Sequence, residues 1–178
     1  LDSTFSAALN ATATDGTVTV AGLTVDDKAT SDATTAVNLT ANGGDVELTT
    51  LTLTASESTS IVVSSAADDS VTIGSLAIGK DGTGGTIDTI TVSGAGTVSL
   101  FEAGQALFAG DTVVNATAST GEFNANMFDA TGKLNVRLGD HSAATGADST
   151  VVTGAGGDVI VGGSGDDNIT AGAGNDNV

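Results

Sequence analysis

The sequence predicts an all-β chain that folds as a parallel β-solenoid, also called a β-helix. Through most of its 178 residues, short runs of β-branched and aliphatic residues alternate with turns rich in Gly, Ser, Asp and Thr. The chain contains no Pro, which suits continuous strand stacking because every backbone N–H is then available for a ladder. Only 3% of the residues are aromatic, so the core must be built in thin layers from Val, Ile, Leu and Ala.

The expected strands follow one another at short intervals up to residue 101. Within them apolar residues alternate with Thr or Ser, as at Val71 and Ile73, so one face of each strand should be buried and the other wet. Spacing alone fits a β-sandwich as well as a solenoid. A sandwich core about 10 Å thick usually needs bulky residues facing each other, so the small aliphatic side chains favour the solenoid. The expected strands are residues 17–20, 46–54, 60–63, 70–73, 86–92 and 97–101.

Aromatic residues cluster in the segment that follows these strands. Residues 101–128 contain four of the five Phe and the only Met, Met127, and the sequence also allows a helical turn around residues 102–108. Clustered aromatic residues beside a repeat array usually bury their large apolar area at an end or corner of the core. We therefore expect the four to pack in the interior rather than to bind a ligand; they are Phe101, Phe108, Phe123 and Phe128.

The composition is strongly acidic, and this limits the partners of the chain. Twenty-two acidic residues face four basic ones, giving a formal charge of −18 that repels phosphate backbones and anionic membrane surfaces. Eighteen of the acidic residues are Asp, a bias expected where short carboxylates sit in tight turns. We therefore expect no nucleic acid partner. No membrane insertion is expected either, because no stretch approaches the ~20 apolar residues of a spanning helix.

The chain has no Cys, so it forms no disulfide and no thiolate metal site. It starts at Leu1 without a Met or a basic signal-peptide region, and it stops at Val178 inside a repeat. We expect a piece of a longer protein, cut at both ends.

The last 26 residues repeat Gly, Asp and an apolar residue with a period of nine. After Arg137 there is no Lys or Arg, yet six Asp follow and Gly becomes dense. The copies span residues 153–161, 162–170 and 171–178, the last ending one residue short. An Asp recurs in each copy, and an apolar residue follows it two positions later: Asp158, Asp167 and Asp176, then Ile160, Ile169 and Val178.

These copies resemble the G-G-x-G-x-D-x-U-x nonapeptide of the RTX family, whose six-residue turn binds Ca²⁺ and whose last three residues form a strand. The middle copy fits every defined position, whereas Thr153 and Ala171 replace the first Gly of the flanking copies. Gly permits the turn conformation, and Asp supplies a hard oxygen for a hard cation. The strand pattern predicts a solenoid-like β-repeat region over residues 1–140, and the resemblance implies a calcium-binding RTX β-roll over 141–178, truncated at its C-terminus.

The resemblance also implies the ligands. Two copies make one coil of the family's roll, so a turn meets the turn 18 residues later, and repeats one and three should share a site. That site takes the carbonyl oxygens of Gly154, Gly156, Ala171 and Ala173 with the carboxylates of Asp158 and Asp176. Asp167, with the carbonyls of Gly163 and Gly165, would need a fourth repeat beyond Val178. Upstream, residues 146–152 contain Asp148 but are expected to lose the phase and to form a degenerate turn.

No catalytic arrangement stands out. His141 is the only His, which leaves no His pair for zinc, and neither H-E-x-x-H nor G-x-S-x-G occurs. Residues 74–80 are spaced like a phosphate loop, but Asp81 follows where Ser or Thr is required. We therefore expect no enzymatic activity.

The whole pattern looks like bacterial surface-layer proteins and large RTX adhesins exported by type I secretion. The resemblance implies a calcium-dependent, extracellular structural protein on the bacterial cell surface. Its expected partners are other copies of itself in a calcium-bridged lattice, with cell-surface polysaccharide as a further candidate. Two alternatives remain open, namely an RTX adhesin segment and the C-terminal RTX module of a secreted protease, lipase or toxin.

Overall fold

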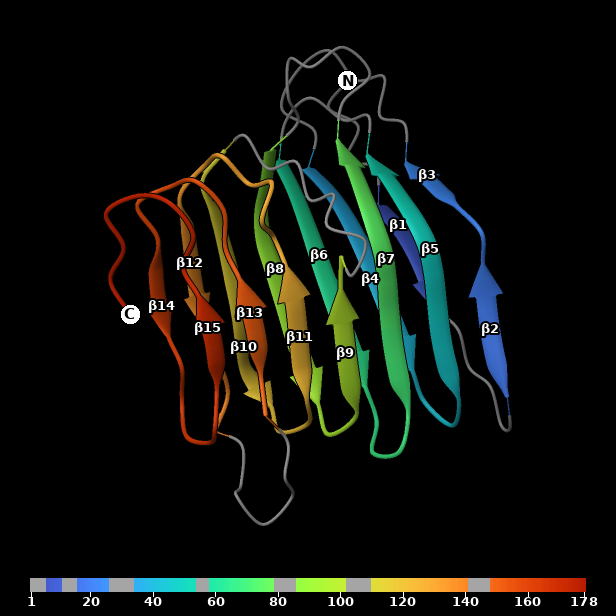
Figure 1. The fold of residues 1–178 in the computed structure, drawn as a ribbon. Helices are drawn as coiled ribbons and strands as arrows, with labels where there is room; N and C mark the ends of the chain where they lie inside the picture. The colour runs from blue at the N-terminus through green and yellow to red at the C-terminus, as the bar shows by residue number, and fades with distance from the viewer. Residues whose placement is uncertain are drawn as a thin grey trace.

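The computed structural model describes residues 6–10, 16–25, 34–53, 58–78, 86–101, 110–140 and 148–178. In these ranges the chain forms two parallel β-sheets that face each other (Figure 1). The first sheet has the order β1 (Ser6–Asn10), β4 (Thr34–Ala41), β6 (Ser58–Ser65), β8 (Thr86–Gly94), β10 (Thr112–Ser119), β12 (Leu134–Arg137) and β14 (Val159–Val161). The second has the order β2 (Thr17–Val20), β5 (Asp45–Leu53), β7 (Ser70–Ile78), β9 (Thr97–Leu100), β11 (Phe123–Asn126), β13 (Thr150–Val152) and β15 (Asn168–Thr170), and β3 (Leu23–Val25) also pairs with β5.

Successive strands alternate between the two sheets through most of the chain, so one coil consists of one strand from each sheet and the turns between them. In Figure 1 the coils run from β1 and β2 at one end to β14 and β15 at the other. This is a parallel β-solenoid, as the sequence predicts. No helix in the described ranges is long and apolar enough to cross a membrane.

The core consists of two columns of aliphatic residues, one from each sheet. Register pairing places the members of each column directly above one another, and all but the last residue of the second column are at most 3% exposed. Burying one Val, Leu or Ile side chain contributes roughly 1.5–3 kcal/mol, so these columns dominate the stability of the coil stack. The first column is Val37, Ile61, Ile90, Val114, Val136 and Ile160, and the second is Leu48, Ile73, Leu100, Ala125, Val151 and Ile169.

The apolar positions of the nonapeptides extend these columns without a break. Ile160 pairs with Val136 in the first sheet, and Ile169 pairs with Val151 in the second. The coil becomes shorter at the same point, because Asp158 lies 24 residues after its hydrogen-bond partner Leu134 but 18 residues before Asp176. Hydrogen bonding therefore continues across residue 140, where the sequence predicts a boundary between two regions.

Aspartates stabilise the turns upstream as well. Oδ1 of Asp45 accepts hydrogen bonds from the backbone N–H and the hydroxyl of Ser70, at 2.8 and 2.9 Å, one coil further along. Oδ2 of Asp69 accepts from the N–H of Gly43 over 2.8 Å. These bonds explain part of the Asp bias, because a short carboxylate reaches the backbone of the neighbouring turn.

The expected aromatic packing is partly wrong. Phe101, Phe123 and Met127 are fully buried in the core. Phe128, however, is 64% exposed, because it leaves β11 at the turn where the chain crosses to the first sheet. Phe108 and the helical turn allowed around residues 102–108 lie outside the described residues.

Candidate calcium site

Repeats one and three stack on one edge of the solenoid, as the resemblance implies. We call this the first edge. It holds the turn 153–158, where the chain passes from β13 in the second sheet to β14 in the first, and the turn 171–176, which follows β15 and stacks on it. Ala155 pairs with Ala173, and the Ala173 N–H donates to the carbonyl of Gly154 over 2.9 Å. The Asn177 N–H donates in the same way to the carbonyl of Asp158 over 2.8 Å. The structure thus brings together the two turns that carry the six ligands expected for this site.

The glycines of repeat three leave room only for the carbonyl oxygens of repeat one. Gly172 and Gly174 have φ angles of +76° and +143°, in the region that disfavours other residues. A Cβ on Gly172 would lie 2.1 Å from the carbonyl oxygen of Gly154, and one on Gly174 would lie 1.6 Å from that of Gly156. A side chain at either position would therefore clash with a carbonyl oxygen of repeat one, so Gly is required for the two turns to stack this closely.

The carboxylate of Asp158 is buried between two coils. The residue is 1% exposed, and its Oδ1 accepts a hydrogen bond from the Leu134 N–H over 2.8 Å. Its Oδ2 is buried as well and has no hydrogen-bond partner among the described residues. A buried anionic oxygen without a partner costs several kcal/mol unless a cation lies beside it. Asp176 is held in the same manner, because its Oδ1 accepts from the Asp158 N–H over 2.9 Å.

Thr153 bonds to one of the expected ligand residues although it departs from the repeat pattern. Its side chain is fully buried, and its hydroxyl donates to the carbonyl of Ala171 over 2.8 Å. Ala171 supplies one of the expected ligand carbonyls, so Thr153 fixes the direction of that carbonyl. Sequence reasoning treated Thr153 only as a missing Gly; the signal was a hydroxyl at the first position of the turn.

The donor set suits calcium. The described residues contain no cluster of three or more His, Asp or Glu side chains, so a cation on the first edge would be held mainly by backbone carbonyls. Ca²⁺ takes six to eight hard oxygen ligands and accepts carbonyls readily. Four carbonyls and two carboxylates reach the lower end of that range. The unpartnered oxygen of Asp158 and the close glycine turns both fit such an ion.

Repeat two lies on the opposite edge, which we call the second edge and which holds the turn 162–167. Gly163 and Gly165 have φ angles of +73° and +133°, and Oδ1 of Asp167 is buried without a hydrogen-bond partner among the described residues. The Asn168 N–H donates to the carbonyl of Ser149 over 2.8 Å. Asp167 therefore shares with Asp158 one buried carboxylate oxygen without a described partner, although the residue as a whole is only half-buried. It lies apart from the first-edge residues, and any partner turn beyond Val178 is outside the sequence.

The sequence predicts that residues 146–152 lose the nine-residue phase, and this prediction is wrong for the strand β13. Val151 is fully buried and pairs with Ile169, so the nine-residue period reaches one copy further upstream than the sequence predicts. Thr150 pairs with Asn168, so Ser149 in this copy is equivalent to Asp167 in repeat two. Asp148 lies one residue before that equivalent position and is exposed. The error arose because the phase was judged by the carboxylate and not by the buried apolar position. His141 lies outside the described residues.

Comparison with known protein families agrees with this longer array. Residues 144–178 match a family model described as the RTX calcium-binding nonapeptide repeat, in four copies. No curated protein and no solved structure matches the chain. The C-terminal segment is therefore an RTX repeat array, which implies calcium binding in a secreted, extracellular protein.

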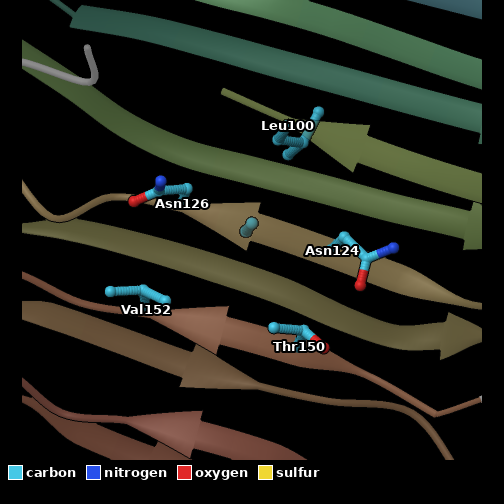
Figure 2. A pocket seen from close by; sticks show the side chains of 6 residues that line it. Leu100, Asn124, Asn126, Thr150 and Val152 are labelled. Atoms are coloured by element: carbon cyan, nitrogen blue, oxygen red, sulfur yellow. The ribbon is translucent and has the colours of Figure 1, made fainter. Parts of the chain in front are cut away.

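A shallow pocket of about 260 Å³ lies elsewhere, on the second sheet (Figure 2). Asn124 and Asn126 on β11 and Thr150 and Val152 on β13 line it, together with Leu100 and Ala125. The amide of Asn124 donates to Oε1 of Glu122 over 2.7 Å. Sequence reasoning did not single out these residues, because they look like ordinary outward positions of two strands.

Proposed function

We propose that the chain is a non-catalytic structural segment of a bacterial cell-surface protein, one that assembles with other copies of itself into a calcium-dependent surface layer. The observation that carries the proposal is the continuity of the core columns, from Val37 to Ile160 and from Leu48 to Ile169. This continuity supports the interpretation that the calcium turns complete one rod. A rigid rod that calcium completes suits a load-bearing layer outside the cell.

Charge supports a role for calcium between copies. Each chain carries a formal charge of −18, so neighbouring copies repel one another at close range. Divalent cations that bind to exposed carboxylates reduce this repulsion more effectively than monovalent salt. Assembly should therefore require calcium even after each chain has folded.

The test is reversible assembly. We expect the purified segment to be monomeric in chelator and to form ordered sheets by negative-stain electron microscopy when calcium is restored. Magnesium at the same concentration is the control, because it has the same charge but a strong preference for octahedral coordination and bound water. A segment that binds calcium and stays monomeric at all protein concentrations would overturn the surface-layer assignment.

The pocket on the second sheet supports a second candidate, an adhesin segment that binds a neutral polysaccharide. Its amide and hydroxyl groups, from Asn124, Asn126 and Thr150, suit sugar hydroxyls, and the acidic chain disfavours anionic glycans. Asn124→Ala with Asn126→Ala should abolish retention on a neutral polysaccharide column. Asn115→Ala, on an exposed position of β10, is the matched control. Equal retention of both variants would count against this candidate.

The third candidate is the RTX module of a secreted protease, lipase or toxin. Catalytic motifs in the gene that encodes the full protein would favour it over the other two.

A further inference from the structure

The position that Asp158 occupies on the first edge is apolar in one coil and acidic in the next two. Asn135 pairs with Val159, and Val159 pairs with Asn177, so the residues before them, Leu134, Asp158 and Asp176, occupy equivalent positions in three successive coils. Leu134 is fully buried in the solenoid core. The calcium turns on the first edge therefore begin at Asp158, and the coil before it offers an apolar side chain at the same position.

Asp158 forms hydrogen bonds to the preceding solenoid coil and to the following repeat coil. Its Oδ1 accepts the Leu134 N–H of the solenoid, and its own N–H donates to Oδ1 of Asp176 in the next coil. Its Oδ2 has no hydrogen-bond partner among the described residues and is buried.

We propose that Asp158 is the coupling residue through which calcium on the first edge orders the preceding solenoid coil. Oδ1 holds the Leu134 N–H at the start of β12, and Oδ2 is left for the cation. The inference rests on calcium binding by the repeats and adds that the effect of the ion extends to a coil that supplies none of its expected ligands.

The physical reason lies in the cost of a buried charge. Without a cation, Oδ2 of Asp158 is buried in a site that is 1% exposed and has no hydrogen-bond partner among the described residues. Any opening that lets water reach the carboxylate relieves this cost, and such an opening breaks the bond to Leu134. With calcium bound, opening would expose the ion as well, so the pairing of β12 with β14 becomes stronger.

Amide hydrogen exchange by NMR, in chelator and in saturating calcium, tests the proposal. The Leu134 N–H reports the bond directly, because its acceptor is Oδ1 of Asp158. We expect calcium to slow its exchange about tenfold or more, the effect expected of a strengthened hydrogen bond to a charged group. The Val37 and Leu48 amides, which lie many coils away, are internal controls and should not respond.

Asp176→Asn separates the coupling from calcium affinity, and Asp158→Asn tests the coupling residue. Asp176→Asn should weaken calcium binding in calorimetry but keep the Leu134 response at higher calcium, because Asp158 is intact. Asp158→Asn removes the buried charge while its amide oxygen still accepts the Leu134 N–H. Exchange at Leu134 should then be no faster than in the unchanged protein in chelator, and calcium should no longer alter it.

The outcomes are distinguishable. If calorimetry shows calcium binding and Leu134 exchange is the same with and without the ion, the coupling is wrong and calcium binding stands. If the unchanged protein binds no calcium, the function proposed for the repeats fails first. If Asp158→Asn keeps the calcium response of Leu134, another residue transmits it and the assignment to Asp158 is overturned.

Discussion

The backbone N–H of Asp158 donates to Oδ1 of Asp176, 18 residues later, over 2.9 Å. The two residues hold the same position in repeats one and three, so the backbone of one repeat orients the carboxylate of the next. The bond thereby orients the Asp176 carboxylate toward the backbone of repeat one. Such preorganisation favours affinity, because less conformational entropy is lost when the ligands close around a cation.

Removing both carboxylates should abolish most of the calcium response. We expect Asp158→Ala combined with Asp176→Ala to weaken calcium-induced order far more than Asp88→Ala, which changes a strand residue of β8 outside the repeats. Far-UV circular dichroism across a calcium titration measures the effect. Equal shifts in the two proteins would contradict a site shared by repeats one and three.

The second edge allows a comparison between adjacent carboxylates. Asp167 has a buried oxygen without a hydrogen-bond partner among the described residues, whereas its neighbour Asp166 is exposed. In a longer segment that supplies the partner turn, Asp167→Asn should lower calcium affinity on this edge about tenfold or more, because a charged ligand is lost. Asp166→Asn, which makes the same change of charge, should alter affinity little. Calorimetry in low salt checks both, and similar losses would show that net charge alone controls binding.

Gly174 should not tolerate a side chain, with or without calcium. Its φ of +143° and the 1.6 Å approach of a Cβ to the Gly156 carbonyl oxygen predict that Gly174→Ala displaces the last turn. Strained backbone of this kind costs on the order of 1–3 kcal/mol. Gly157→Ala is the matched control, since its Cβ would lie 3.4 Å from the nearest atom. Chemical unfolding in calcium should separate the two variants, and equal midpoints would contradict the packing described here.

Thr153 can be tested through its hydroxyl. Thr153→Ala removes the bond to the Ala171 carbonyl and should reduce calcium affinity several-fold, with a loss of about 1 kcal/mol in the free energy of unfolding. Thr153→Ser retains the hydroxyl and should restore most of the affinity. Calorimetry and urea unfolding give the two quantities separately. An Ala variant with normal affinity would mean that the hydroxyl contributes only to stability.

The periodic parts of the molecule could be predicted from the sequence, and the irregular parts could not. The apolar positions Ile160 and Ile169 follow from a strict nine-residue spacing, and the resemblance to the RTX roll implied the pairing of repeats one and three. Upstream, the spacing between paired residues varies from coil to coil, 24 residues for Leu134 and Asp158 but 25 for Asp45 and Ser70. A variable period does not identify partners, so the bond between Leu134 and Asp158 was invisible in the sequence.

Phe123 and Phe128 provide a last test, of the solenoid rather than of the calcium site. Both were expected in the core, but Phe123 is fully buried and pairs with Val98 of the neighbouring strand, while Phe128 is 64% exposed. Phe123→Ala should therefore cost about 3–5 kcal/mol in the free energy of unfolding, through lost burial and a cavity. Phe128→Ala should stay within about 0.5 kcal/mol of the unchanged protein. Urea unfolding in chelator makes the comparison, because the solenoid core contains no expected calcium ligand. A large loss from Phe128→Ala would mean that the exposed ring is covered by another copy of the chain, and repeating the experiment over a range of protein concentrations would reveal it.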